Sequence, residues 1–88
     1  MKVIFKSSFV QDLKKVKAPV FKQRVREIIE LAEQARNLQE MGDLRKLRGS
    51  DRYYRIRTGD HRIGLSVEDD TIVFVRFLHQ RDIYRYFP

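Results

Sequence analysis

The stretch YYRIRTGDHR, residues 53–62, decides how this chain folds, because within it arginines alternate with Tyr54 and Ile56 at strand period. Side chains two residues apart on a strand leave the same face, so Arg55 and Arg57 point away from the face that Ile56 enters. Arginine stays charged at any working pH, and its planar fork matches a phosphate group. The pattern predicts a strand with a phosphate-binding face; a basic face that is only solvated is the alternative interpretation.

The cationic character extends beyond this strand. Between Arg45 and Arg62 the chain carries six arginines and one lysine, and over its 88 residues the formal net charge is +7, with a sequence pI of about 10.1. Such a balance favours polyanionic partners, namely nucleic acid, a ribosome surface or an acidic protein. A membrane surface fits less well, because no segment combines a dense basic face with bulky apolar residues.

The first half of the chain predicts two amphipathic helices. A short β-type run at residues 3–5 is followed by Ser7 and Ser8, a pair typical of a helix N-cap. Apolar stripes at helical spacing then continue through both helices, and Pro19 suits the first position of the second. The stripe residues are Phe9, Leu13 and Val16 in the first helix and Phe21, Val25, Ile28, Ile29 and Ala32 in the second.

The second half predicts three strands, at about residues 53–58, 62–68 and 71–78, joined by links short enough for antiparallel hairpins. Before them we expect a basic loop segment anchored by Leu44 and Leu47. The tail from residue 80 to 87 is expected as a short helical turn or an extended segment. Together these patterns predict one α+β domain over residues 1–88. In it an N-terminal strand and a helical hairpin pack on one face of an antiparallel β-sheet and leave the other face open.

Composition argues against several kinds of chemistry. Cysteine is absent, which leaves no disulfide or thiolate site and fits a reducing compartment. His61 and His79 lack an obvious third metal ligand, and the scattered glycines form no phosphate loop. The N-terminal apolar run is too short for a signal peptide, and no stretch has membrane length. We expect a cytoplasmic protein with no cofactor, no metal and no membrane partner.

Strand alternation gathers further candidates near the arginines. It places Arg62 on the face of Arg55 and Arg57, across the hairpin, where like charges destabilise the empty protein. A ligand that neutralises these charges would explain the arrangement. After the last strand, Arg81 and Tyr84 are three residues apart, which puts them on one side of a helical turn.

These residues also resemble a known family. The segments LRG (47–49), YRIR (54–57), GDHRI (59–63) and HQRDIY (79–84) are similar in type and order to motifs of the RelE/ParE toxin superfamily. The resemblance covers nearly the whole chain and implies a small antiparallel sheet flanked by two N-terminal helices. It also implies a toxin of a type II toxin–antitoxin system whose partner is a small acidic antitoxin.

The resemblance further implies an activity. RelE-like members cleave mRNA on the ribosome by metal-free attack of a 2′-hydroxyl, whereas ParE-like members inhibit DNA gyrase; we expect the first activity and keep the second as the alternative. Arginine stands where the family has lysine, and arginine is a poor proton acceptor, so the general base stays open. The candidate catalytic residues are Arg55, Arg57, Arg62, Arg81 and Tyr84, with His79 and Tyr86 as further candidates; the candidate RNA-binding residues are Arg45, Lys46, Arg48, Arg52 and Arg85.

Overall fold

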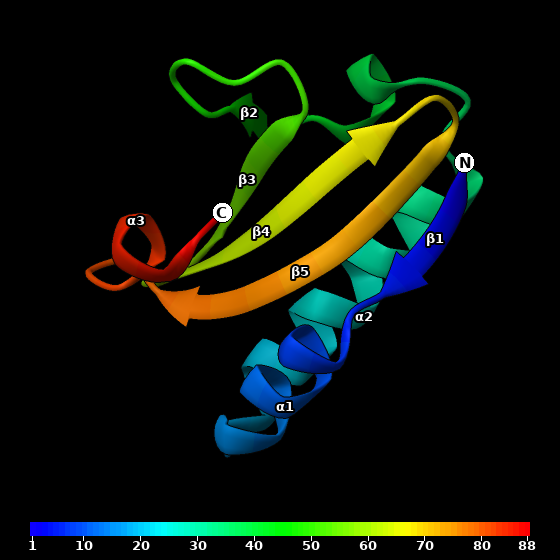
Figure 1. Cartoon of the computed structure of the whole chain (residues 1–88). Helices are drawn as coiled ribbons and strands as arrows, with labels where there is room; N and C mark the ends of the chain where they lie inside the picture. Colours follow the sequence, from blue (N-terminus) through cyan, green and yellow to red (C-terminus); the bar gives the residue numbers. More distant parts are fainter.

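A computed structural model describes all of residues 1–88 and shows a five-stranded sheet with two helices packed against it (Figure 1). None of its helices combines the length and the hydrophobicity that a membrane span requires. In chain order the elements are β1 (Lys2–Phe5), α1 (Ser7–Lys15), α2 (Pro19–Gln34), the 3-10 turn η1 (Leu38–Met41), β2 (Leu44–Lys46), β3 (Tyr53–Thr58), β4 (His61–Glu68), β5 (Thr71–His79) and α3 (Ile83–Tyr86).

The sheet confirms the predicted α+β fold class. Its strand order is β1-β5-β4-β3-β2, and β2 to β5 form successive antiparallel pairs, including both predicted hairpins. Two features were not predicted. β1 joins the edge of the sheet parallel to β5. The basic segment before β3 also forms a strand, β2, which at three residues is too short for its alternation to be recognised.

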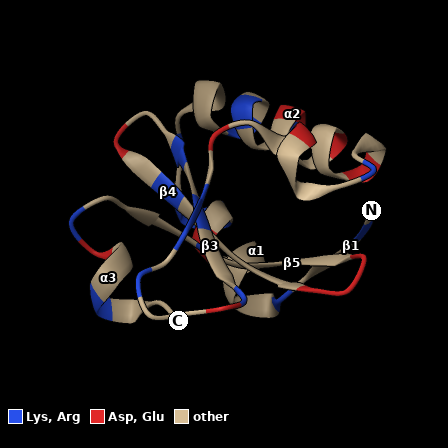
Figure 2. Ribbon diagram, turned by 90° about the horizontal axis from the view of Figure 1, so that it is seen from above, with Lys and Arg blue, Asp and Glu red and all other residues tan.

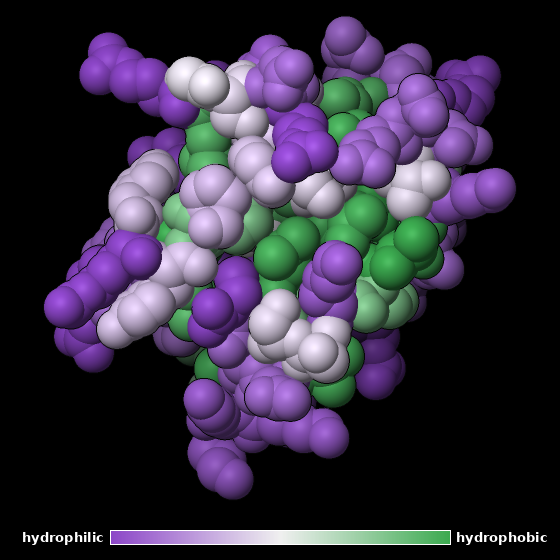
Figure 3. Space-filling model, viewed as in Figure 1, coloured by the Kyte–Doolittle hydropathy of each residue, from purple (hydrophilic) through white to green (hydrophobic).

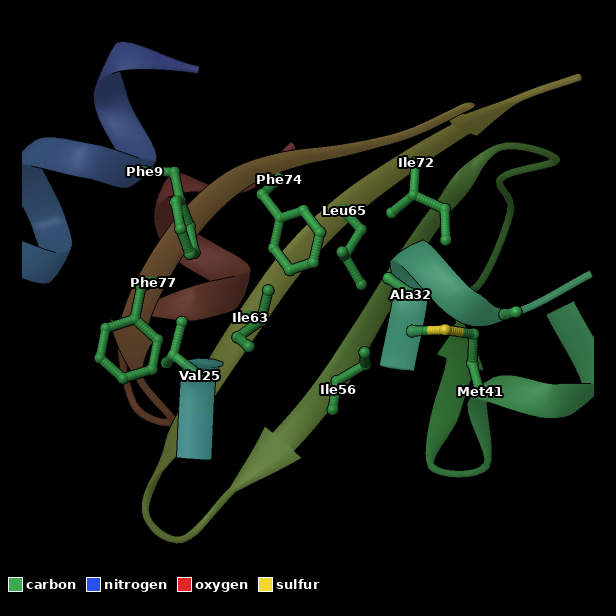
Figure 4. Close-up of a cluster of buried hydrophobic side chains, with 11 residues drawn as sticks. Phe9, Val25, Ala32, Met41, Ile56, Ile63, Leu65, Ile72, Phe74 and Phe77 are labelled. Atoms are coloured by element: carbon green, nitrogen blue, oxygen red, sulfur yellow. The ribbon is translucent and has the colours of Figure 1, made fainter. Parts of the chain in front are cut away.

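The hydrophobic core lies on one face of the sheet, beneath α2. The predicted stripe of α2 is confirmed, with Val25 and Ala32 fully enclosed and the other members partly buried. Alternation on the strands supplies the opposing side chains, and the close-up in Figure 4 shows them pointing toward α2. The sheet residues of this core are Ile56, Ile63, Leu65, Ile72, Phe74 and Phe77.

Helix α1 completes the edge of the sheet where β1 ends. β1 pairs only with the first part of β5, and beyond it two α1 side chains bond the exposed backbone. Ser8 Oγ donates to the Val75 carbonyl at 2.6 Å, and the Asp12 carboxylate accepts from the Phe77 N–H at 3.0 Å. The prediction that Ser7 and Ser8 cap the helix is therefore wrong. No side chain caps α1, and the Ser8 hydroxyl bonds the backbone of β5 instead.

The opposite face of the sheet is less open than predicted. The chain turns back after β5, and α3 with the residues after it lies in front of the strands (Figure 1). Ile83 is fully buried and Phe87 is only 3% exposed. Of the two forms expected for the tail, a helical turn or an extended segment, the helical turn is the one that exists. It covers part of the face that carries the arginines because two apolar side chains hold it there.

Candidate functional site

Three arginines leave the same face of the sheet, away from α2. Arg57 lies directly opposite Arg62 on the neighbouring strand, and Arg55 lies opposite Gly64. Figure 2 shows basic positions on β3, β4 and α3, whereas α2 mixes both signs. The space-filling view of this face shows hydrophilic side chains gathered around α3 and apolar ones across the middle of the sheet (Figure 3). The predicted strand parity is therefore confirmed for all three arginines.

The C-terminal residues complete a shallow cavity over these arginines. Its volume is about 410 Å³, and Gln80, Arg81 and Tyr84 form the side opposite the strands. All five residues predicted as the principal catalytic candidates line it: Arg55, Arg57, Arg62, Arg81 and Tyr84. The cavity contains four guanidinium groups and no carboxylate among its lining residues, so it is suited to an anion.

Tyr84 is held in this cavity by a hydrogen bond across the sheet. Arg55 Nε donates to the Tyr84 hydroxyl oxygen at 2.9 Å. Tyr84 as a whole remains 66% exposed, so its hydroxyl is fixed while the side chain stays accessible. Arg55 Nη1 is buried without a hydrogen-bond partner. The pair can therefore offer an exposed ring and the Tyr84 O–H donor to a nucleotide.

Arg62 is fixed by three hydrogen bonds. Its Nη1 donates to the Gly59 carbonyl at 2.9 Å and to the His61 carbonyl at 2.8 Å, and its Nη2 donates to Gln80 Oε1 at 3.0 Å. A guanidinium has five N–H groups, so Nε–H and one Nη2–H remain for a ligand. Burial lowers the pKa of Arg62, and the charges of Arg57 and Arg55 lower it further. An anion in the cavity would relieve this unfavourable charge.

The five residues predicted to bind RNA lie in different surroundings. Arg45 is opposite Arg55 and lines an adjoining cavity of about 340 Å³ with Asp43, Arg55 and Arg57, so it extends the cationic surface. Lys46 is opposite Tyr54, on the helix side of the sheet.

The remaining three predicted RNA-binding residues lie outside both cavities. Arg48 belongs to the loop between β2 and β3. Arg52 pairs with Glu68 at 3.3 Å, and Arg85 lies over the ring of its neighbour Tyr86, 5.7 Å from the centroid. The fold therefore brings only Arg45 next to the predicted catalytic group.

Two further catalytic candidates, His79 and Tyr86, lie outside the cavity and line a different depression near α1. His79 Nδ1 accepts from the Arg81 N–H at 3.2 Å, and its Nε2 lies 3.5 Å from Asp60. The hydrogen bond with His61, at 2.8 Å, is the main cause that lowers the pKa of Asp60. The hydrogen bond to Arg81 and the contact with Asp60 hold His79 in the turn after β5, which favours a structural role for this histidine over a catalytic one.

Sequence reasoning missed Gln80, which supports the site, and Asp12, which supports the scaffold beside it. Gln80 bonds Arg62 through its side chain, and its N–H donates to the Asp60 carbonyl at 2.7 Å. Asp12 is 6% exposed and binds Arg76. A signal for Asp12 existed, since it is a lone carboxylate beside the apolar stripe of α1. Gln80 lies within the HQRDIY motif, but nothing in the sequence marks its bond to Arg62, which depends on how the tail folds back.

Fold and site together define a small basic α+β protein with an anion-binding cavity on one face of its sheet. Residues 3–84 match the family model described as the ParE toxin of type II toxin–antitoxin system, parDE. The chain therefore belongs to the RelE/ParE superfamily of type II toxins, which confirms the resemblance seen in its motifs.

Two kinds of comparison support this membership. The chain is 46% identical over 89 residues to the toxin RelE3 of Methanocaldococcus jannaschii, and the alignment covers 100% of both chains. Its structure is similar to that of one chain in the RelB-RelE antitoxin-toxin complex from Methanococcus jannaschii. The TM-score is 0.80 at 42% identity, and the match covers 97% of this chain and 99% of that chain. The archaeal RelE-RelB complex from Pyrococcus horikoshii gives a TM-score of 0.70 at 25% identity, covering 90% of this chain and 93% of that one.

Proposed function

We propose that this toxin is a ribosome-dependent mRNA endoribonuclease. The observation that carries the proposal is the cavity in which four arginines and Tyr84 converge. The 46% identity to a protein named toxin RelE3 supports a RelE-like rather than a gyrase-directed activity. Charge and geometry agree, because a phosphodiester is the anion that guanidinium forks and a stacking ring recognise together.

The chemistry is attack on the scissile phosphate by the neighbouring 2′-hydroxyl. A base removes the hydroxyl proton, the O2′–P bond forms as the P–O5′ bond breaks, and an acid protonates the leaving 5′-oxygen. Arg62 and Arg81 hold the phosphate and stabilise the negative charge of the phosphorane. Arg55 and Arg57 orient the RNA backbone along β3. Arg62 is suited to its role because its hydrogen bonds fix it before substrate arrives.

Tyr84 has two candidate roles in this scheme. Its exposed ring can stack on a base, and its hydroxyl can take part in proton transfer. Arg55 occupies one lone pair of the hydroxyl oxygen, so the O–H itself is free to donate. Phenylalanine removes only the hydroxyl and alanine removes the ring as well, which makes the two roles separable by substitution.

The proposal is tested in a reconstituted translation reaction in which mRNA is mapped for cuts after addition of the purified toxin. We expect cuts on ribosome-bound mRNA and little cleavage of free RNA, because the ribosome positions the substrate. Gyrase supercoiling is measured alongside with the same protein. Intact mRNA together with inhibited supercoiling would sink the nuclease proposal in favour of the gyrase alternative.

We also propose that the toxin binds a cognate acidic antitoxin. The solved relatives from Methanococcus and Pyrococcus are antitoxin–toxin complexes, and the net charge of +7 favours an acidic partner. Electrostatic attraction speeds association and is screened by salt, so the association rate should fall steeply as salt rises. A rate that is constant between low and physiological salt would contradict the electrostatic part.

A further inference from the structure

Phe87 is buried on the face of the sheet that carries the arginines. Its side chain is 3% exposed, although α2 and the main core lie on the other face. The ring lies over Gly64 of β4 and edge-on to Tyr53 of β3, with 5.6 Å between the ring centroids and an interplanar angle of 83°. Phe87 therefore joins the C-terminal segment to two strands of the sheet.

Gly64 provides the space that this ring occupies. A Cβ atom at Gly64 would lie 2.8 Å from Cδ1 and Cγ of Phe87, closer than carbon atoms approach in proteins. The backbone of Gly64 is not in the left-handed region, so glycine is needed there for room rather than for conformation. Its cross-strand partners are Arg55 on one side and Arg76 on the other, so the missing side chain leaves a slot between two arginines.

The seated ring fixes the direction in which Tyr84 points. The Phe87 N–H donates to the Ile83 carbonyl at 2.9 Å, and both side chains are buried against the sheet. Successive residues of a helix diverge by about 100°, so Tyr84 and Tyr86 point about 200° apart on either side of these anchors. Tyr84 reaches the arginine cavity, and Tyr86 lines the depression near α1.

We propose that Phe87, packed on Gly64, is a positioning residue that sets Tyr84 against the arginines of β3 and β4. It touches neither RNA nor the reacting atoms in this scheme, and it acts through the segment that it anchors. The inference rests on the proposed nuclease function, in which a displacement of catalytic groups by about 1 Å can cost on the order of a hundredfold in rate.

The kinetic test uses the mRNA-cleavage assay with substitutions that leave every catalytic side chain in place. Phe87→Ala is expected to lower kcat about a hundredfold with little change in KM, because the strand-borne arginines still bind RNA. Phe87→Leu keeps most of the volume and should recover much of the rate. Gly64→Ala should reproduce the loss, and it should add little in the Phe87→Ala background. Phe5→Ala, a control that removes an aromatic contact at the far edge of the sheet, should keep its kcat.

A second measurement does not depend on cleavage. The Arg55 Nε–H, which bonds Tyr84, and the backbone amides of Tyr86 and Phe87 should exchange faster in Phe87→Ala, while those of β4 and β5 stay protected. A wild-type protein that cuts no mRNA would contradict the proposed function. In that case the exchange data would still show whether the contact of Phe87 with Gly64 holds the tail in place. Unchanged exchange in Phe87→Ala, or wild-type kcat in both Phe87→Ala and Gly64→Ala, would overturn the positioning role.

Discussion

Arg62 and Arg76 lie on neighbouring strands of one sheet in opposite electrostatic surroundings. Arg76 makes a bidentate contact with Asp12: Nε donates to Oδ2 at 2.7 Å and Nη2 donates to Oδ1 at 3.1 Å. This hydrogen bonding raises the pKa of Arg76. Arg62 has no carboxylate in its hydrogen bonds, and burial together with the charges of Arg57 and Arg55 lowers its pKa.

The difference separates scaffold from site. Folding pairs the charge of Arg76 with the carboxylate of Asp12, and this ion pair holds α1 against β5. Folding leaves Arg62 among like charges, an arrangement that costs stability and is best balanced by an anion from outside the chain. The same side chain is thus structural in one place and available to a ligand in the other, and each prediction below tests one half of that contrast.

The largest expected effect concerns the site. Arg62→Ala and Arg81→Ala should each lower mRNA cleavage about a hundred- to a thousandfold, or about 3–4 kcal/mol of transition-state stabilisation, with circular dichroism unchanged. Arg36→Ala is the matched control, because it removes the same charge from an exposed position paired only with Glu40. Full toxicity in both site variants at normal expression would contradict the assignment of these arginines.

For the Asp12–Arg76 ion pair we predict a loss of stability rather than a loss of activity. Asp12→Ala should lower the free energy of unfolding by about 3 kcal/mol, because Arg76 loses its counter-ion and the Phe77 N–H loses its acceptor. Asp12→Asn keeps an acceptor and should lose less. Urea denaturation of both variants measures the difference, and a loss below about 1 kcal/mol in Asp12→Ala would show that the ion pair matters little.

Tyr84 is expected to matter more than Tyr86, since only Tyr84 shares the cavity with the arginines. Tyr84→Ala should reduce the transition-state stabilisation of cleavage by about 1–3 kcal/mol, which is what a ring stacked on a base usually contributes. Equal cleavage by Tyr84→Phe and wild type would identify a stacking platform, whereas equal loss in Tyr84→Phe and Tyr84→Ala would identify proton transfer. An inactive Tyr86→Phe beside an active Tyr84→Ala would reverse the assignment.

The smallest effect is a gain in stability. Arg57 lies directly opposite Arg62, so Arg57→Gln should stabilise the free protein by about 0.2–0.5 kcal/mol at low salt. The gain should vanish at high salt, where exposed charges are screened. Arg57→Lys keeps the charge and serves as the control in the same thermal unfolding series. Equal stability of the Gln and Lys variants at low salt would mean that the arginines do not repel one another.

The sequence by itself determined the fold class, the direction of Arg55, Arg57 and Arg62, and the apolar stripe of α2. These features follow from periods of two and 3.6 residues, which are properties of the local backbone and need no knowledge of distant contacts. The family followed as well, because its motifs are short segments whose order can be read directly from the chain.

Only the tertiary structure decided how distant segments meet. Asp12 and Arg76 are 64 positions apart, Phe87 reaches back to Gly64, and β1 adds to β5 in parallel. The spacing to Arg81 favoured Tyr84 over Tyr86 from the sequence alone, but it did not show where the helical turn would lie. The turn lies over the arginines because Ile83 and Phe87 become buried against the sheet, and this contact exists only in the tertiary structure.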